Sequence, residues 1–298
     1  MTTSRVAHSS SPTPNERCLA RAPGGPHVTG RVMNARMYAV TAQVEDAWRE
    51  LLGRITADAG VRLAYVPYPA PQALENLWSR DDLGAVFMCG YPIAMQLAAV
   101  TPIAAPIPRA PWAAGRALYR TDLIVREDAP YATLEDTFGG RAGWTVAHSH
   151  SGFNAFRHHL LRYRTAGRPA LYSQMSGNLV TARNVLDSVR ERRIDVGPLD
   201  AYWHLLIARH APALTAGIRV LACTDVAPMP AFVAAASAPP QMTERLRAAF
   251  IGAARQPWFA PLADYLLLDG FAESSEAAFS SLLEWDRAAK AAGFEWPA

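Results

Sequence analysis

An alternation of short apolar segments with amphipathic segments constrains the fold of this chain most strongly. The alternation begins near Met33 and continues towards the C-terminus. Residues 83–88 form a continuous apolar run, which is typical of a strand that is buried on both faces. Residues 44–55 instead carry apolar side chains at helical spacing. Strands that alternate with helices predict an α/β fold in which mostly parallel sheets are flanked by helices.

The same pattern predicts how the elements follow one another. We expect strands at residues 36–40, 61–66, 83–88, 118–126, 142–147, 170–173, 194–196, 218–222 and 231–236. We expect helices at residues 44–55, 71–78, around 95–97, at 131–140, from 151, from 178, at 202–206, 241–254 and 275–292. Long strands near residues 120 and 220 predict two lobes joined by a two-strand hinge. The first lobe then comprises residues 33–120 plus 222–298, and the second comprises residues 121–221.

Composition limits the classes of function. The chain has 298 residues, half of them hydrophobic, which is enough for two lobes with cores of their own. Its net charge is only +3, and no basic cluster is interleaved with aromatic residues, so we expect no nucleic-acid partner. No apolar run is long enough to cross a bilayer, so we expect no membrane insertion. Three scattered cysteines suit neither a disulfide framework nor a Cys-x-x-Cys metal site.

The first residues differ from the rest of the chain. Residues 1–32 are rich in Ser, Thr, Pro, Arg and Gly, and contain no apolar stretch typical of a signal peptide. We therefore predict a disordered extension over residues 1–32. Met33, just before the first strand-like run, is a candidate natural start. As written, the chain is expected to be cytoplasmic, and it is expected to be periplasmic if its start is misassigned.

The segment Thr145-Val-Ala-His-Ser-His-Ser-Gly-Phe-Asn154 carries the strongest functional signal. A predicted strand runs into Ser149, His150, Ser151 and Gly152, and a predicted helix follows. The first N–H groups of a helix lack internal partners and carry partial positive charge, so they attract anions. Hydroxyl groups beside them can donate further hydrogen bonds. The plain alternative, in which the serines only cap the helix, remains open.

Other predicted strand ends should meet the same place, because ligands of open α/β sheets bind beyond the carboxyl ends of the strands. These ends carry Tyr38, Cys89, Gly90, Tyr91, Ser149, His150, Ser151, Ser176, Gly177, Asn178 and Asp200. Together with Gly152 they are predicted to line one cleft between the lobes. That convergence predicts a ligand site.

Four of these segments resemble the phosphate and phosphonate substrate-binding proteins of ABC importers. The segments are Phe87-Met-Cys-Gly-Tyr-Pro92, Ser149-His-Ser-Gly152, Ser176-Gly-Asn178 and Gly197-Pro-Leu-Asp200. The resemblance covers residues 33–271 and implies a two-lobed type II periplasmic-binding fold. It further implies a non-catalytic protein that captures a small oxyanion, with an ABC permease as partner, no cofactor and a monomeric or weakly dimeric state.

The chain also departs from the pattern of that family. His150 stands where the family's Ser-Thr-Ser-Gly loop has Thr, and Asn178 is close to the place of a family His. No acidic residue that would hold the amine of an aminophosphonate is evident in residues 170–178. The resemblance therefore implies oxyanion binding more strongly than it implies a working importer.

Individual residues leave alternatives open. An ionised Asp200 facing the pocket would repel a fully ionised phosphate and favour a ligand that carries a proton or an amine; alternatively, Asp200 only caps the following helix. A protonated His150 would donate to an anion and make affinity pH-dependent, or else His150 is structural. Cys89 is expected to be a buried structural thiol, and its contact with a soft ligand such as arsenite is the alternative. Tyr38 and Tyr91 are either ligand donors or core aromatics.

Two other functions are alternatives to transport. An enzyme is disfavoured because the chain has no Gly-x-Ser-x-Gly elbow and no His-Glu-x-x-His pattern, and we expect no metal. A cytoplasmic ligand sensor that signals by lobe closure is the second rival.

Overall fold

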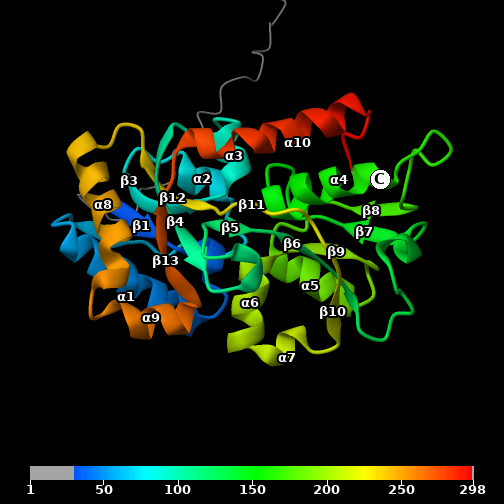
Figure 1. Cartoon of the computed structure of the whole chain (residues 1–298), viewed down its shortest axis with the longest axis horizontal. Helices are drawn as coiled ribbons and strands as arrows, with labels where there is room; N and C mark the ends of the chain where they lie inside the picture. The colour runs from blue at the N-terminus through cyan, green and yellow to red at the C-terminus, as the bar shows by residue number, and fades with distance from the viewer. Residues whose placement is uncertain (1–29, 297–298) are drawn as a thin grey trace, which may run out of the picture.

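Six strands form the largest sheet in the computed structural model, which describes residues 30–296. Their spatial order is β13-β4-β12-β3-β1-β2 (Figure 1). The strands are β1 (Arg31–Asn34), β2 (Leu63–Tyr65), β3 (Leu83–Met88), β4 (Val100–Pro108), β12 (Ala231–Ala235) and β13 (Leu268–Glu273). The helices grouped with them are α1 (Ala42–Asp58), α2 (Leu74–Trp78), α3 (Gly90–Ala94), α8 (Pro240–Gly252) and α9 (Phe259–Leu266). These elements form the lobe on the left of Figure 1.

The other lobe contains two smaller sheets. Strand β6 (Thr121–Arg126) lies between β10 (Ile218–Cys223) and β9 (Gly197–Asp200), and β7 (Arg141–Gly143) pairs with β8 (Gln174–Ser176). A parallel bridge between Ala142 and Val196 connects the two sheets. The helices of this lobe are α4 (Ala155–Leu160), α5 (Ala182–Arg190), α6 (Ala201–His210) and α7 (Pro212–Thr215).

Three further elements link the two lobes. The short strands β5 (Leu118–Tyr119) and β11 (Ala227–Pro228) pair antiparallel where the chain passes between the lobes. Helix α10 (Ser280–Ala291) lies across the top of both lobes in Figure 1. The segment that follows α10 reaches the second lobe, where Phe294 packs into the cluster that contains Leu123 and Phe156.

The structure corrects the prediction that the sheets are mostly parallel. In the six-stranded sheet β1 is parallel to β2 and β3, whereas β12 is antiparallel to β3 and β4, and β13 is antiparallel to β4. The reason is that the chain re-enters this sheet from the second lobe, so β12 runs against the strands it joins. The sheet is mixed, and the α/β class is confirmed.

The predicted strand at residues 36–40 is wrong. The first strand is β1, and residues 36–38 form a 3₁₀ turn after it. The Asn34 side chain donates to the Val66 carbonyl at 2.7 Å and accepts from the Arg36 N–H at 2.7 Å, which turns the chain. Val32 is fully buried in β1, so residues 31–32 do not belong to an extension. The rest of the predicted extension, residues 1–29, lies outside the described residues.

Several elements of the structure were not predicted, and others lie several residues from their predicted place. Strand β4 contains Pro102, Pro106 and Pro108, and proline argues against a central strand because it cannot donate to the ladder. Helix α9 and strand β13 were not predicted. The predicted strands at 142–147, 170–173 and 194–196 are instead β7, β8 and β9, whose bounds differ by several residues.

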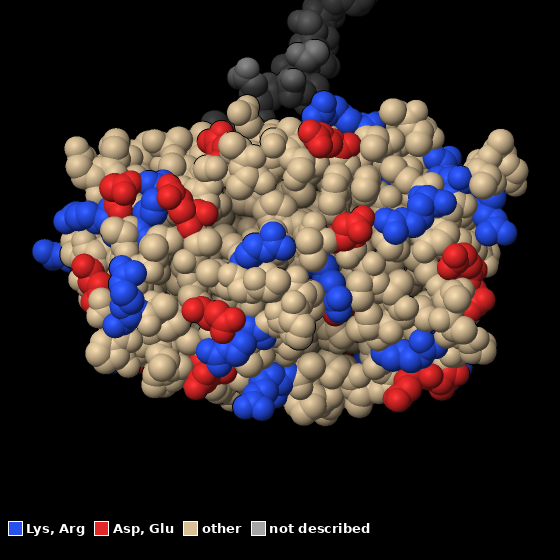
Figure 2. Space-filling view, in the orientation of Figure 1, with Lys and Arg blue, Asp and Glu red and all other residues tan. Residues whose placement is uncertain are grey.

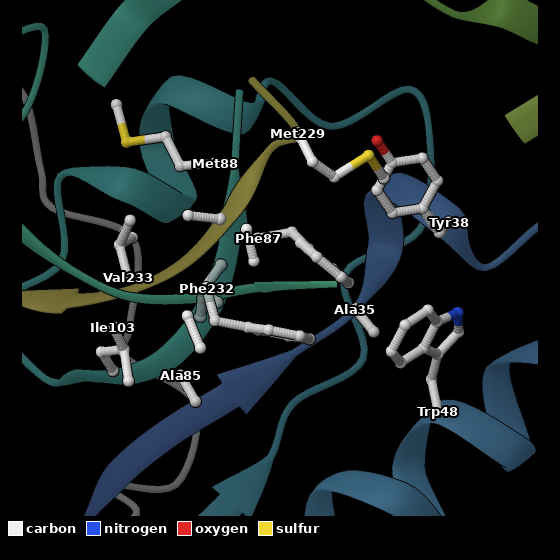
Figure 3. Packing of buried hydrophobic residues seen from close by; sticks show 14 of the residues in the cluster. Ala35, Tyr38, Trp48, Ala85, Phe87, Met88, Ile103, Met229, Phe232 and Val233 are labelled. Atoms are coloured by element: carbon white, nitrogen blue, oxygen red, sulfur yellow. The ribbon is translucent and has the colours of Figure 1, made fainter. Parts of the chain in front are cut away.

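Aromatic packing holds the core of the first lobe together (Figure 3). Phe87 of β3 stacks on Phe232 of β12, with ring centroids 3.7 Å apart. The rings of Trp48 and Tyr38 meet Phe87 edge-on at 5.2 and 5.0 Å. Burying each such side chain contributes about 1.5–3 kcal/mol to stability. Packing in the core therefore fixes the Tyr38 ring whether or not a ligand is bound.

Charged side chains are mixed on the surface. On the face shown in Figure 2, basic and acidic side chains are scattered among each other. Across the described part of the chain many of them pair, as Arg109 does with Asp264 and Asp269. Within residues 30–296, no helix combines the length and the apolarity that a membrane span needs.

Candidate functional site

A cleft of about 650 Å³ lies between residues of the two lobes. Its first wall comprises residues 36–40 and 68–71, helix α2 and Cys89. Its second wall comprises residues 145–146, 148–149, 151–152 and 180–184, together with Pro198, Asp200 and Trp203. The walls therefore come from the turn after β1 and the end of β3 on one side, and from the loops after β7, β8 and β9 on the other.

Half of the predicted site residues line this cleft. They are Tyr38, Cys89, Ser149, Ser151, Gly152 and Asp200. They come from the ends of strands far apart in the chain, so the predicted convergence of strand ends brings these six together. Their roles as ligand contacts stay a prediction.

Gly90, Tyr91 and His150 do not line the cleft. A Cβ atom on Gly90 would lie 2.3 Å from the Phe279 ring, so α3 packs against the segment before α10. Tyr91 is 3% exposed, and burial and the nearby Asp286 of α10 raise the pKa of its hydroxyl. His150 is 1% exposed, and its ring lies 5.1 Å from the ring of Trp285, also in α10.

Residues 176–178 lie away from the cleft as well. Ser176 pairs with Gly143 in the β7–β8 ladder, and a Cβ atom on Gly177 would lie 2.3 Å from the Trp144 ring. Asn178 is exposed, with φ of 54°. The helix predicted from Asn178 begins only at Ala182, where the Thr181 hydroxyl accepts a hydrogen bond from the Asn184 N–H at 3.1 Å. The turn before α5 separates this segment from the cleft.

Asp200 connects the two walls. Its Oδ2 accepts a hydrogen bond from the Tyr38 hydroxyl at 2.9 Å. Its Oδ1 accepts from the N–H groups of Tyr202 and Trp203 at 2.9 and 3.0 Å, so Asp200 caps helix α6. The capping alternative is thus confirmed, and the same carboxyl group lines the cleft.

The charge of Asp200 differs from the sequence-based expectation. Burial raises the pKa of this carboxyl to about 7, although the hydrogen bonds from Trp203, Tyr38 and Tyr202 act in the opposite direction. Near neutral pH a substantial fraction of Asp200 is therefore protonated. Since a neutral carboxyl group does not repel an anion, the repulsion expected of an ionised Asp200 is weakened.

Cys89 and Tyr119 form a buried pair at the cleft. The Cys89 thiol lies 3.8 Å from the Tyr119 hydroxyl and accepts a hydrogen bond from the His150 N–H at 3.3 Å. Cys89 is 5% exposed, and burial raises the pKa of its thiol. A protonated, packed thiol is a weak ligand for soft ions, so the structural interpretation of Cys89 is favoured.

His150 cannot act as the protonated donor that the sequence suggested. Burial lowers the pKa of its imidazole to about 3, so the ring is neutral at physiological pH. Its Nδ1 lies 3.4 Å from the amide nitrogen of Asn154. The structural alternative for His150 is therefore the one that fits.

The serine loop combines capping with access to the cleft. The Ser149 hydroxyl accepts a hydrogen bond from the Gly152 N–H at 3.0 Å and caps a π-helical turn, His150–Asn154. The Gly152 N–H, which was predicted to hold an anion, already has this partner. The Ser151 carbonyl accepts a hydrogen bond from the Thr121 hydroxyl at 3.1 Å.

Sequence reasoning missed Thr145 as a cleft residue. Its Oγ1 is buried and has no hydrogen-bond partner within residues 30–296. A Cβ atom on Gly152 would lie 2.0 Å from this oxygen, so only glycine fits at that position. Thr145 was assigned to a strand, but β7 ends at Gly143, which leaves Thr145 in the loop that lines the cleft.

Arg36 was also missed, because the misplaced first strand covered it. Its guanidinium donates to the Gln72 carbonyl and lies 5.4 Å from the centre of the Tyr68 ring. Burial lowers the pKa of this guanidinium, with Tyr68 and Glu75 acting against the shift. A basic residue directly after a strand end was the available signal. An arginine therefore lines the cleft beside the hydroxyl groups of the serine loop.

A second contact joins the walls at helix α2. His148 Nδ1 lies 3.2 Å from Glu75 Oε1, and the His148 ring meets the Trp78 ring edge-on at 5.7 Å. Burial lowers the pKa of His148, whereas Glu75 raises it. Within the described residues, no group of three or more His, Cys, Asp or Glu side chains is arranged to hold a metal ion.

Comparison with known proteins identifies the kind of molecule that shares this architecture. Residues 38–279 match the model of a family described as the periplasmic substrate-binding protein of a phosphonate ABC transporter. A search of curated proteins finds no match.

Solved structures share the fold at low sequence identity. A binding protein component of an ABC phosphonate transporter from Pseudomonas aeruginosa superposes with a TM-score of 0.73 at 14% identity, over 89% of this chain and 88% of that one. PhnD1 from Prochlorococcus marinus, in complex with methylphosphonate, gives 0.70 at 14% identity, over 87% and 98% of the two chains. A Xanthomonas citri protein bound to ATP gives 0.61 at 19% identity, over 89% and 98%. The two-lobed type II periplasmic-binding fold predicted from the sequence is confirmed.

Proposed function

This chain belongs to the family of periplasmic substrate-binding proteins of phosphonate ABC transporters, and on that premise we propose that its cleft captures a small tetrahedral oxyanion, phosphonate-like or phosphate-like. Members of this family bind small molecules and deliver them to an ABC permease; they are not enzymes. The observation that carries the proposal is that Ser149 and Ser151 of one wall face the same cleft as Tyr38 of the other wall.

The donors around the cleft suit an anion. Ser149 and Ser151 carry hydroxyl groups that can donate, and Arg36 adds a positive charge, whereas the Tyr38 hydroxyl donates to Asp200. An anion that leaves water needs several such donors, because its desolvation is very costly without them. A hydrogen bond to a charged group contributes about 1.5–3 kcal/mol, so four or five can support micromolar binding after the association penalty.

The raised pKa of Asp200, about 7, supports a ligand that carries one proton. A phosphonate near neutral pH exchanges between its monoanion and its dianion. The protonated form of either partner lets the carboxyl group and the ligand share a hydrogen bond instead of repelling each other.

Isothermal titration calorimetry tests the proposal. The purified full chain is titrated with methylphosphonate, phosphate, phosphite and sulfate at pH 7. We expect micromolar or tighter binding of at least one phosphorus oxyanion, with competition among those that bind. Absence of binding to every phosphorus oxyanion would overturn the proposed ligand class.

We further propose that the chain works in the periplasm, in keeping with its family. The alternatives from the sequence are a cytoplasmic location and a role as a ligand sensor. Fractionation of cells that express the full-length natural gene separates them. Recovery of the protein with periplasmic markers supports transport, and recovery with cytoplasmic markers supports the sensor.

A further inference from the structure

The cleft is much larger than a small tetrahedral anion. A water molecule occupies about 30 Å³ of the liquid, and a phosphonate head group displaces on the order of two or three water volumes. The cleft measures about 650 Å³, within the range of about 300–1,000 Å³ that is typical of pockets for much larger organic ligands. A head group alone leaves most of this space unfilled.

This volume does not arise from two walls that are held apart. At helix α2, His148 Nδ1 already lies 3.2 Å from Glu75 Oε1. At the end of β9, the Tyr38 hydroxyl already lies 2.9 Å from Asp200 Oδ2. Because the walls touch at two separate places, the side chains between these contacts determine the space that remains.

Those side chains are mostly apolar. The first wall presents Val40, Leu74 and Trp78, and the second presents Val146, Val180 and Trp203. Val180 is 40% exposed and lines the cleft, so its apolar surface is open to a ligand there. Covering such a lining with apolar ligand surface is favourable, because it removes apolar area from water. A small hydrophilic anion has no apolar surface to cover it.

The backbone conformation of Val180 also supports a ligand contact at this residue. This β-branched residue has φ of 68°, a conformation that is strained for its side chain. Its N–H donates to the Thr145 carbonyl at 3.2 Å, and the Leu179 N–H donates to the Trp144 carbonyl at 3.1 Å. The loop is thereby fixed on the wall that carries Ser149 and Ser151. Strain of this kind persists where the surroundings enforce it, commonly at ligand clamps.

The acidic groups of the cleft are already engaged. Asp200 accepts three hydrogen bonds, from Tyr38, Tyr202 and Trp203. Glu45 accepts a hydrogen bond from the Tyr65 hydroxyl at 3.1 Å. Each carboxyl group is therefore partly occupied, and the positive charge of Arg36 in the same cleft disfavours the ammonium group of an aminophosphonate. The part of the ligand beyond its head group is better matched by hydrocarbon.

We infer that the ligand is an organic anion with a single phosphonate-type head group and an apolar body about as large as an aromatic ring. The inference rests on the proposed function and adds the chemistry of the ligand body. The hydroxyl groups and Arg36 hold the head group, and the apolar side chains of both walls cover the body.

Calorimetry with a matched ligand series tests the inference. The full chain is titrated with methylphosphonate, 2-aminoethylphosphonate, butylphosphonate and benzylphosphonate. We expect benzylphosphonate to bind at least tenfold more tightly than methylphosphonate, a difference of about 1.4 kcal/mol, and 2-aminoethylphosphonate to gain nothing over methylphosphonate. Equal or weaker binding of benzylphosphonate overturns the inference.

Variants of the cleft test the contribution of the ligand body to affinity separately from that of the head group. Leu74→Gln places an amide on the apolar lining and is expected to reduce the ratio of benzylphosphonate to methylphosphonate affinity at least fivefold. Leu97→Gln is the matched control, because Leu97 is 46% exposed and lies outside the cleft. An unchanged ratio in Leu74→Gln, or an equal fall in the control, contradicts the inference.

The outcomes also distinguish this inference from the proposed function. If methylphosphonate binds and benzylphosphonate does not, the proposed function stands and the inference fails. Phenylacetate has the same aromatic body with a carboxylate head group. If it binds and no phosphonate does, the proposed phosphonate head group is wrong and the apolar body of the ligand is supported. If neither class binds, both fail.

Discussion

The Tyr38 hydroxyl donates a 2.9 Å hydrogen bond to Oδ2 of Asp200 and so joins the turn after β1 to the end of β9. Tyr38 is 1% exposed and Asp200 is 9% exposed, so the bond lies at the floor of the cleft. It connects the two lobes in addition to the paired strands β5 and β11.

Tyr38→Phe is expected to destabilise the protein. The variant keeps the ring in the aromatic core but leaves a buried carboxyl group without one donor, which costs about 1–3 kcal/mol. Urea denaturation measures the change. Tyr265→Phe serves as control, because Tyr265 is 39% exposed. Equal stability of Tyr38→Phe and wild type would show that the bond contributes nothing.

Asp200 is expected to make stability fall as pH rises. Its pKa is about 7 in the folded chain, above the usual aspartate value of 3.8. Between these two values the folded state binds more protons than the unfolded state, so this group's contribution to the free energy of unfolding decreases as pH rises, by about 1.4 kcal/mol for each unit of pKa difference. The Asp200→Asn variant removes that contribution.

Comparison of unfolding curves from pH 4 to 8 measures the effect as a difference between wild type and Asp200→Asn. Histidines with lowered pKa act in the opposite direction in both proteins and cancel in this difference. Exposed Asp81 provides the control variant, Asp81→Asn. A difference that does not change with pH would contradict the raised pKa.

Glu75→Gln is expected to lower the pKa of His148 further. Burial lowers this pKa and Glu75 is the group that raises it, so removal of the charge leaves burial unopposed. Titration of the imidazole Cε1 proton by NMR measures the shift. Glu50→Gln, at an exposed helix pair with Arg54, is the control. A pKa that stays constant or rises would show that Glu75 and His148 do not interact in solution.

The double variant Ser149→Ala/Ser151→Ala is expected to weaken oxyanion binding at least tenfold, about 1.4 kcal/mol. It removes two hydroxyl groups from the cleft and the cap of the π-helical turn. Calorimetry with methylphosphonate measures the loss. Ser79→Ala/Ser280→Ala is the matched control, since both hydroxyls donate to local carbonyls on exposed helix ends. Unchanged affinity in the first double variant would refute the serine loop as the anion site.

Gly152→Ala is expected to destabilise the protein by about 1–3 kcal/mol through overpacking. The new methyl group would lie 2.0 Å from Thr145 Oγ1. Thr145→Ala removes that oxygen and should recover part of the loss, which a double-mutant cycle by thermal denaturation detects. Additive effects of the two substitutions would contradict the contact.

Much of the fold was predictable because it depends on local patterns. The apolar run of β3, the amphipathic face of α1 and the serine-rich loop before α4 are visible in the sequence, and all three are present. Five of the six predicted residues that line the cleft were found by one rule, the convergence of strand ends, and Gly152 was found from the serine loop before a helix. Strand β4 could not be predicted in the same way, because its prolines oppose a strand and only its neighbours β12 and β13 stabilise it.

The amino-acid sequence by itself determined the α/β class, the family and the position of the serine loop, because periodicity and short motifs act within a few residues of the chain. Only the tertiary structure decided the pKa of Asp200, the neutral state of His150 and the place of Thr145 and Arg36 on the cleft. These properties depend on burial by segments far apart in the sequence, and burial in a low-dielectric interior changes the energy of a charge more than any neighbour along the chain does.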